Sequence, residues 1–147
     1  MSDFSIGTSD FEEGGEIPRK CGYKFGNERP ELYFRALPEK TKSQVIIMDD
    51  PDAMAAVGKV WVHLLEYHYW TSKDYMIPDA SFYGKNDFGE IDYGGPAPPD
   101  GKHTYIFKSY CLDVELDLKQ GFSKQEAEEA MTDHIIAEAK LTGTFTT

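Results

Sequence analysis

The stretch that decides the fold is Val45-Ile46-Ile47-Met48-Asp49-Asp50-Pro51-Asp52, a short run of β-branched and apolar residues that ends at carboxylates around a proline. Val60–Leu65 and Tyr105–Tyr110 are runs of the same kind, and clusters of Gly, Pro and Asp separate the runs. Such apolar runs favour strands and such clusters favour turns. With 14% aromatic residues, 13 Gly and 8 Pro, the chain predicts a mainly β, antiparallel sandwich or barrel.

One segment near the end of the chain has a different period. Ser123-Lys124-Gln125-Glu126 has the pattern of a capping box at a helix start. Apolar residues then follow at helical spacing, namely Ala127, Ala130, Met131 and Ile135, with His134 beside them. The pattern predicts one short amphipathic helix, on which His134 is a packed residue and not a ligand.

Size and charge limit the classes of function. A chain of 147 residues fits a single domain, 1–147, with a core of its own. Fifteen Lys and Arg against 26 Asp and Glu give a net charge of −11 without any basic run. Nucleic acid and anionic membranes are repelled at long range by such a chain. We therefore expect neither partner, nor stable membrane anchoring, and an anionic ligand must be captured locally.

The termini and cysteines point to an ordinary cytoplasmic protein. Met1–Ser5 lacks the basic and apolar regions of a signal peptide, and no apolar stretch approaches the roughly 18 residues of a membrane span. Cys21 and Cys111 lie far apart, without the spacing of a zinc or redox motif. Two buried thiols are the simplest interpretation, and a disulfide between them stays open.

Two carboxylates stand where the first strand ends. Asp50 and Asp52 flank Pro51, and alternation in an extended chain places them on one face. Carboxylates at a strand exit either take part in a site or cap the following turn through hydrogen bonds to the backbone. Both interpretations of this pair stay open.

The same two-residue spacing recurs as Trp61 with His63 and as His103 with Tyr105. A lone histidine in an apolar strand is usually a core residue satisfied by a carbonyl or a carboxylate. Two of them near Asp-rich and Pro-rich turns favour a shared pocket, because an Asp partner raises the pKa of an imidazole and leaves one N–H for a ligand oxygen. Phosphate or carboxylate would suit such donors.

Gly94-Gly95-Pro96 adds backbone that a ligand can approach closely, with N–H groups at the glycines that can bind an anion; otherwise it is a tight, rigid loop. The sequence contains no nucleophile elbow, phosphate loop, dinucleotide fingerprint or zinc-protease motif. We therefore predict a protein that is not an enzyme and has no cofactor. Two imidazoles and two carboxylates also suit a divalent metal, but hydrogen-bonded pairs without an ion are the favoured interpretation.

At these residues the chain resembles the phosphatidylethanolamine-binding protein (PEBP) family, also called Raf kinase inhibitor-like proteins. The resemblance rests on Asp50-Pro51-Asp52-Ala53-Met54, on Trp61-Val62-His63 and on Gly94–Tyr105. It extends from Gly14-Gly15-Glu16-Ile17-Pro18 to the ending Leu141-Thr142-Gly143-Thr144-Phe145. The length and this ending are similar to the shorter bacterial and archaeal YbhB/YbcL branch.

The resemblance implies a Greek-key β-sandwich with a small anion pocket at one end. Family members bind phosphate, phosphoethanolamine-type headgroups or carboxylates such as acetate there. The matching residues of this chain are Asp50, Asp52, Trp61, His63, Gly95, Pro96, His103 and Tyr105. The resemblance also implies a regulatory alternative, inhibition of a kinase or serine protease through surface loops such as Phe82–Gly89, and a homodimer, since short members are often dimers.

The chain departs from the family pattern in three places, one of them Val62, which replaces a residue that is often another His. Met54 stands where a proline is usual, so the conformation of the Ala53–Met54 backbone stays open. Glu66 and His68 interrupt a run that is usually apolar. Strict alternation places both on the face opposite to His63, and we expect them at a subunit contact or a solvated patch.

Overall fold

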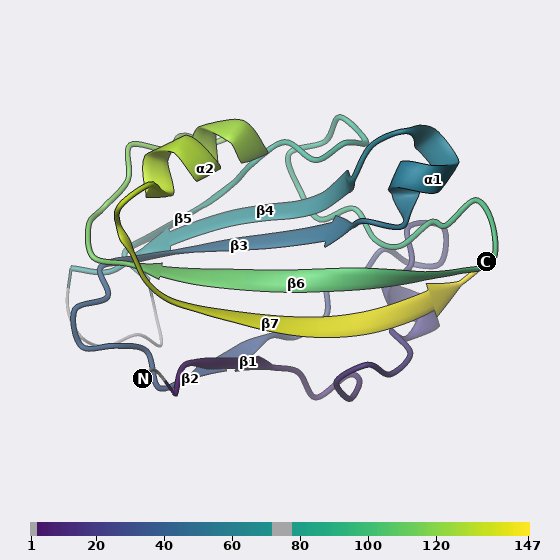
Figure 1. Cartoon of the computed structure of the whole chain (residues 1–147), viewed down its shortest axis with the longest axis horizontal. Coiled ribbons are helices and arrows are strands. Elements are labelled where there is room, and N and C mark those ends of the chain that lie inside the picture. The colour runs from purple at the N-terminus through teal and green to yellow at the C-terminus, as the bar shows by residue number, and fades with distance from the viewer. Residues whose placement is uncertain (1–2, 72–77) are drawn as a thin grey trace.

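The structure is a computed structural model that describes residues 3–71 and 78–147. It consists of antiparallel strands, two short α-helices and one 3₁₀ turn (Figure 1). In chain order the elements are β1 (Ser5–Gly7), η1 (Arg19–Cys21), β2 (Tyr33–Arg35), β3 (Ser43–Asp50), α1 (Ala53–Val57), β4 (Trp61–Tyr69), β5 (Ala80–Tyr83), β6 (Lys102–Leu112), α2 (Lys124–Met131) and β7 (Ile135–Thr146).

The main sheet has the strand order β5-β4-β3-β6-β7, and all its neighbouring pairs are antiparallel. Strands β3, β4 and β5 follow one another as neighbours, and β6 then returns to lie beside β3. This spatial order is a Greek key. The three apolar runs recognised in the sequence form β3, β4 and β6, the three central strands, whose inward residues are almost fully buried.

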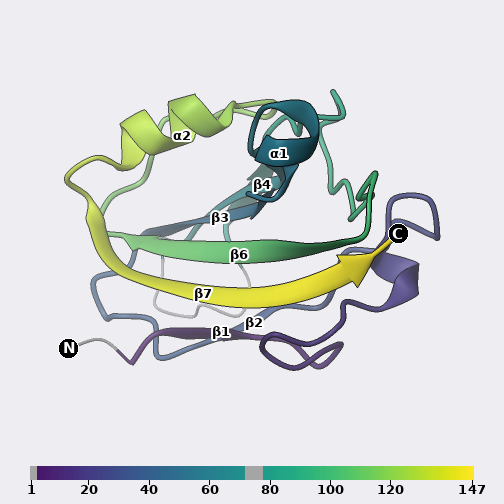
Figure 2. The ribbon, with the colours of Figure 1, turned by 45° about the vertical axis from the view of Figure 1, so that its right-hand side comes forward.

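Different layers cover the two faces of this sheet. Figure 2 shows α2 on one side of it and the small β1–β2 sheet on the other. Ile46, Met48 and Tyr105 pack with Ile6 of β1, whereas Val45 and other residues of the opposite face pack with the α2 side. The predicted antiparallel β-sandwich with a C-terminal helix is confirmed.

A β-bulge in β4 changes which side chains share a face. Met48 pairs with Leu64 while Asp49 pairs with Val62, so His63 is the extra residue. The His63 ring contacts Tyr105, and Tyr105 and Leu64 belong to the same core cluster. His63 and Leu64 therefore lie on one face of the sheet.

This bulge makes the strict-alternation prediction for Glu66 and His68 wrong, because it brings both onto the face of His63. The Glu66 residue is 2% exposed, so it forms no solvated patch. Its side chain binds Arg29 and His68 inside the sandwich.

The helix α2 begins as the sequence predicts. Ser123 Oγ accepts from the Glu126 N–H, and the Glu126 carboxylate accepts from the Ser123 N–H, which completes the capping box. The helix ends earlier than predicted, at Met131, because Asp133 adopts a left-handed backbone (φ 69°) that turns the chain into β7. His134 therefore lies beyond the helix, where its Nδ1 is 3.0 Å from Asp113 Oδ1.

Both cysteines are free and buried. Burial raises the pKa of the Cys21 thiol to about 11 and that of the Cys111 thiol to about 12. These thiols are protonated and act as small apolar core residues.

No helix within the described ranges is long and apolar enough to cross a membrane. Among the described residues the longest helix is α2 with 8 residues, whereas a spanning helix needs about 20.

Candidate functional site

A pocket of about 170 Å³ lies where β3 ends and β4 begins. The helix α1, the loop after β5 and the loop before β6 complete its walls. Its lining is mostly apolar or aromatic: Ala53, Ala56, Val57, Trp61, Phe88, Ala97, Pro99 and Tyr105, together with Asp50 and His63. Four of the residues predicted for a ligand site, Asp50, Trp61, His63 and Tyr105, therefore line one cavity.

Asp50 holds His103 in a fixed position behind this pocket. His103 Nδ1 lies 2.6 Å from Asp50 Oδ2, and His103 Nε2 lies 2.9 Å from Asp100 Oδ1. Burial alone would lower the pKa of His103, but the hydrogen bonds to Asp50 and Asp100 raise it above its ordinary value. His103 is thus a protonated imidazole that orders the Asp50 carboxylate. We predicted that it donates to a ligand, but both nitrogens already have carboxylate partners.

His63 has the opposite electrostatic state. Its Nδ1 lies 2.7 Å from the Gly94 carbonyl oxygen, which can only accept, so Nδ1 carries the proton. Burial lowers the pKa of His63 despite the raising effects of the Gly94 carbonyl, of Asp50 and of the Gly95 backbone. The ring is therefore neutral, and Nε2, which makes no hydrogen bond to any described residue, is an acceptor.

Two donors in the pocket wall have no partner among the described residues. The Tyr105 hydroxyl is buried and makes no hydrogen bond, and the Trp61 Nε1 is buried without an acceptor. Burial and the charge of Asp50 raise the pKa of Tyr105. The nearby Ala97 backbone offsets part of this rise, although it does not reach hydrogen-bond geometry with the Tyr105 hydroxyl. Tyr105 therefore keeps its proton and can donate it. A buried donor without an acceptor costs free energy that a ligand can recover.

The glycine segment supports the pocket but does not offer the donors that we expected. The Gly94 N–H donates to the His63 carbonyl at 2.9 Å, and the Gly95 N–H donates to Asn27 Oδ1 at 2.7 Å. A Cβ on Gly95 would lie 1.9 Å from the Cys21 carbonyl oxygen, so only glycine fits there. The Pro96 carbonyl accepts from the backbone N–H of Tyr23 at 2.9 Å.

Asp52 is a positioning residue for the backbone. Its Oδ2 accepts from the Thr104 N–H at 2.8 Å, and its own N–H donates to Asp50 Oδ1 at 2.9 Å. It precedes α1, so the Ala53–Met54 backbone is helical, and no described residue has a cis peptide bond. Asp52 therefore joins β3 to β6 and does not orient an imidazole.

The loop after β5 forms one wall of the pocket. The Phe88 ring contacts Trp61 and His63, each at 5.6 Å between centroids, and stacks on Tyr23 at 4.0 Å. Asn86 anchors the loop: it is 3% exposed and its amide bonds to three backbone groups.

The sequence of this segment, Phe82–Gly89, allows two interpretations: a loop that overhangs the site, or an ordinary surface connection. Phe82 and Tyr83 belong to β5, and the remainder is anchored. Sequence reasoning missed the role of Phe88, and the small apolar residues of α1 carry no signal that could have identified them.

The imidazoles and carboxylates do not converge on a common point. His63 turns to a carbonyl while His103 lies between two aspartates. Across residues 3–71 and 78–147, no group of three or more His, Cys, Asp or Glu side chains is arranged to hold a metal ion. The arrangement offers two donors and one neutral acceptor to a small polar group.

Comparisons with known proteins agree with the fold and with these motifs. Residues 7–146 match the family model described as phosphatidylethanolamine-binding protein. A UPF0098 protein of Methanothermobacter thermautotrophicus is 37% identical over 96% of this chain and 97% of its own length. A UPF0098 protein of Chlamydia trachomatis is 38% identical over 92% of this chain and 93% of its own length.

Solved structures give the same result. The crystal structure of a putative PEBP homolog of Chlamydia trachomatis superposes with a TM-score of 0.88, at 34% identity, over 100% of this chain and 99% of that one. Escherichia coli YbcL, at 24% identity, shares the fold, with a TM-score of 0.86 and 99% of both chains covered. The chain belongs to the phosphatidylethanolamine-binding protein family.

Proposed function

We propose that the pocket lined by Asp50, Trp61, His63 and Tyr105 binds a small oxyanion: phosphate, a phosphoryl headgroup or a carboxylate. The observation that carries the proposal is the Tyr105 hydroxyl, which is buried in the pocket wall and has no acceptor among the described residues. An oxyanion supplies the missing acceptor to Tyr105 and to Trp61 Nε1. The family resemblance supports the same ligand class.

The size of the pocket and the protonation state of His63 limit the choice of ligand. Pockets for drug-sized molecules have about 300–1,000 Å³, so a pocket of about 170 Å³ admits a single small group. The neutral His63 offers an acceptor at Nε2, which a hydrogen phosphate or a protonated acid can satisfy. Because the dianion of a phosphate monoester carries no P–OH group, we expect such monoesters to bind better as the monoanion than as the dianion.

The proposal is a binding function without turnover. The described lining includes no Ser, Cys, Thr or Lys that could act as a nucleophile. The Asp50 carboxylate already accepts hydrogen bonds from His103 and from the Asp52 N–H. We propose that the pocket binds its ligand without transforming it, and that this binding serves regulation.

Tyrosine substitutions test this function directly. Acetate, inorganic phosphate and phosphoethanolamine are titrated calorimetrically into the protein and into its Tyr105→Phe variant, which lacks only the hydroxyl. Loss of one hydrogen bond to a charged group predicts about tenfold weaker binding or more. Tyr93→Phe is the matched control, because the Tyr93 hydroxyl is equally buried but donates to the Cys21 carbonyl at 2.7 Å. Equal affinity of all three proteins would refute the assignment.

We do not extend the proposal to docking of a kinase or protease through Phe82–Gly89. The contacts of Asn86 and Phe88 place this loop in the pocket wall, and no contact among the described residues points to a protein partner.

A further inference from the structure

A second, larger cavity lies at the opposite end of β3 and β4. Its volume is about 470 Å³, within the range of small-molecule sites. It is bounded by the β1–β2 layer on one side and the main sheet on the other. Its described lining is Arg29, Leu32, Tyr33, Phe34, Leu37, Gln44, Ile46, His68, Trp70 and Pro78.

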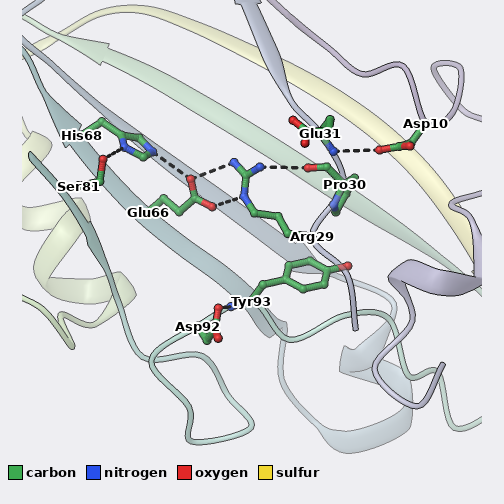
Figure 3. A network of polar contacts seen from close by, with 9 residues as sticks. All are labelled: Asp10, Arg29, Pro30, Glu31, Glu66, His68, Ser81, Asp92 and Tyr93. Carbon is green, nitrogen blue, oxygen red and sulfur yellow. Dashed lines mark hydrogen bonds and ion pairs between the residues drawn. The ribbon is translucent and has the colours of Figure 1, made fainter. Parts of the chain in front are cut away.

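A charged network around the buried Glu66, drawn in Figure 3, contributes Arg29 and His68 to the lining of this cavity. The Glu66 carboxylate, 2% exposed, accepts from Arg29 Nε and, at 3.0 Å, from Arg29 Nη2. It also lies 2.9 Å from His68 Nε2, while His68 Nδ1 is 2.6 Å from Ser81 Oγ on the neighbouring strand. Four side chains from three separate segments are thus locked together.

The network turns the guanidinium of Arg29 to the cavity. Arg29 and His68 line the cavity, whereas Glu66 is behind them and does not. Burial would raise the pKa of Glu66, but the hydrogen bonds from His68 and Arg29 lower it, so the carboxylate is ionised. The buried carboxylate therefore fixes the guanidinium without presenting negative charge to a ligand.

Arg29 retains N–H donors that bind none of the described residues. A guanidinium has five N–H groups, and three are used: Nε and Nη2 bind Glu66, and Nη1 binds the Pro30 carbonyl at 3.0 Å. One N–H remains on each terminal nitrogen. Two N–H groups on neighbouring nitrogens match the two oxygens of a carboxylate.

The rest of the described lining is mostly apolar, and its polar member Gln44 donates from Nε2 to Ser109 Oγ at 2.8 Å. Leu32, Phe34, Leu37 and Ile46 contribute aliphatic and aromatic surface, and Trp70 adds an indole that is 6% exposed. A ligand complementary to this lining has an apolar body and one anionic end.

We propose that this cavity is a second binding site, for a small amphiphilic carboxylate whose head pairs with Arg29 and whose apolar body fills the space between the two sheets. The site is independent of the small-oxyanion pocket, because no residue lines both cavities. A single guanidinium, already paired with Glu66 in a chain of net charge −11, favours one negative charge over two.

The two tryptophans of the chain allow a direct test, since Trp61 lines the small pocket and Trp70 the large cavity. In a Trp61→Phe variant, decanoate below its micelle concentration is titrated while Trp70 fluorescence is recorded. A saturable change is expected. Decanol, which has the same chain without the charge, is expected to bind at least about tenfold more weakly, as the loss of a charge-assisted hydrogen bond implies.

Substitutions locate the head of the ligand. In the Trp61→Phe background, the double substitution Arg29→Met with Glu66→Met removes the ion pair without leaving a buried charge, and decanoate affinity should fall to that of decanol. Lys40→Met, which removes an exposed positive charge outside the cavity, should leave it unchanged. If the double variant does not fold, Arg29→Lys keeps a partner for Glu66 but loses the planar pair of donors, and decanoate should again bind about tenfold more weakly.

Three results would overturn the proposal. The first is the absence of a saturable Trp70 response to decanoate. The second is equal affinity for decanoate and decanol. The third is a response of Trp61 in a Trp70→Phe variant with no response of Trp70, which would assign decanoate to the small pocket.

Discussion

The two cavities lie at opposite ends of one face of the central sheet, and both are built on a buried carboxylate that fixes an imidazole. In the small pocket the carboxylate itself, Asp50, lines the cavity and its partner His103 stands behind. In the large cavity Arg29 and His68 line the space and Glu66 stands behind. The proposed ligands therefore rest on different donors: in the small pocket on the neutral Tyr105 hydroxyl and Trp61 Nε1 beside a carboxylate, and in the large cavity on the guanidinium of Arg29.

The largest expected effect concerns the Arg29–Glu66 pair. Arg29→Met leaves an ionised carboxylate in the core with only His68 as its side-chain partner. We expect the free energy of unfolding to fall by about 3 kcal/mol or more, as for other broken buried pairs. Urea denaturation of the single variant measures this loss.

The double variant Arg29→Met with Glu66→Met separates a structural from a functional role of the pair. Because it leaves no unpaired charge, it should recover most of the lost stability. A double variant as unstable as the single one would show that the pair is needed for folding. The Arg29–Glu66 pair could then not be assigned to ligand binding in the large cavity.

A smaller loss is expected at the other end of the sheet. Asp50→Asn weakens the charged hydrogen bond to His103 and should lower the free energy of unfolding by about 2 kcal/mol. It should also lower the pKa of His103, which a ¹H–¹⁵N titration of the imidazole detects. Asp52→Asn is the control, because Asp52 is exposed and makes no contact with an imidazole. An unchanged His103 pKa in Asp50→Asn would contradict the assigned pairing.

The two pocket histidines should give stability opposite dependences on pH. The folded pKa of His103 is raised, so its contribution is complete below the unfolded value of about 6.5 and is lost as the pH rises through the folded value. The folded pKa of His63 is lowered, so its contribution is present above about 6.5 and is lost as the pH falls. The melting temperature measured against pH should lose the His103 slope in His103→Gln and the His63 slope in His63→Gln. Identical pH profiles of the two variants would be inconsistent with the assigned charge states.

The smallest effect on stability is expected for Asp100→Asn. The Asp100 side chain is 76% exposed, and exposed ion pairs contribute about 0–1 kcal/mol. The substitution also frees His103 Nε2 and removes a negative charge near the pocket, so acetate should bind more tightly. Calorimetry checks the affinity, and weaker binding would indicate that Asp100 serves the ligand.

The sequence predicted the sandwich, because β-branched runs and turn clusters are local signals, and the capping box at Ser123 was equally local. It also placed Trp61 with His63 and His103 with Tyr105. It failed where position depends on contacts between distant segments. The bulge at His63 reverses alternation for the rest of β4, and Asn27 and His63 use the N–H groups of Gly95 and Gly94.

The large cavity was beyond sequence reasoning for the same reason. Arg29 and Glu66 are 37 residues apart and meet only because the β1–β2 layer folds over the sheet. Glu66 looked like an interruption of an apolar strand, and no local pattern identifies its partner. Phe88 likewise became a pocket residue only through the packing of its loop.

The most direct test of the small-oxyanion pocket follows the two indole N–H signals in a ¹H–¹⁵N spectrum during titration with acetate and phosphate. Each cavity contains one of the two tryptophans of the chain. The Trp61 signal should shift and saturate while the Trp70 signal stays in place. A static Trp61 signal, or parallel movement of both signals, would contradict the assignment of oxyanion binding to the Asp50 end of the sheet.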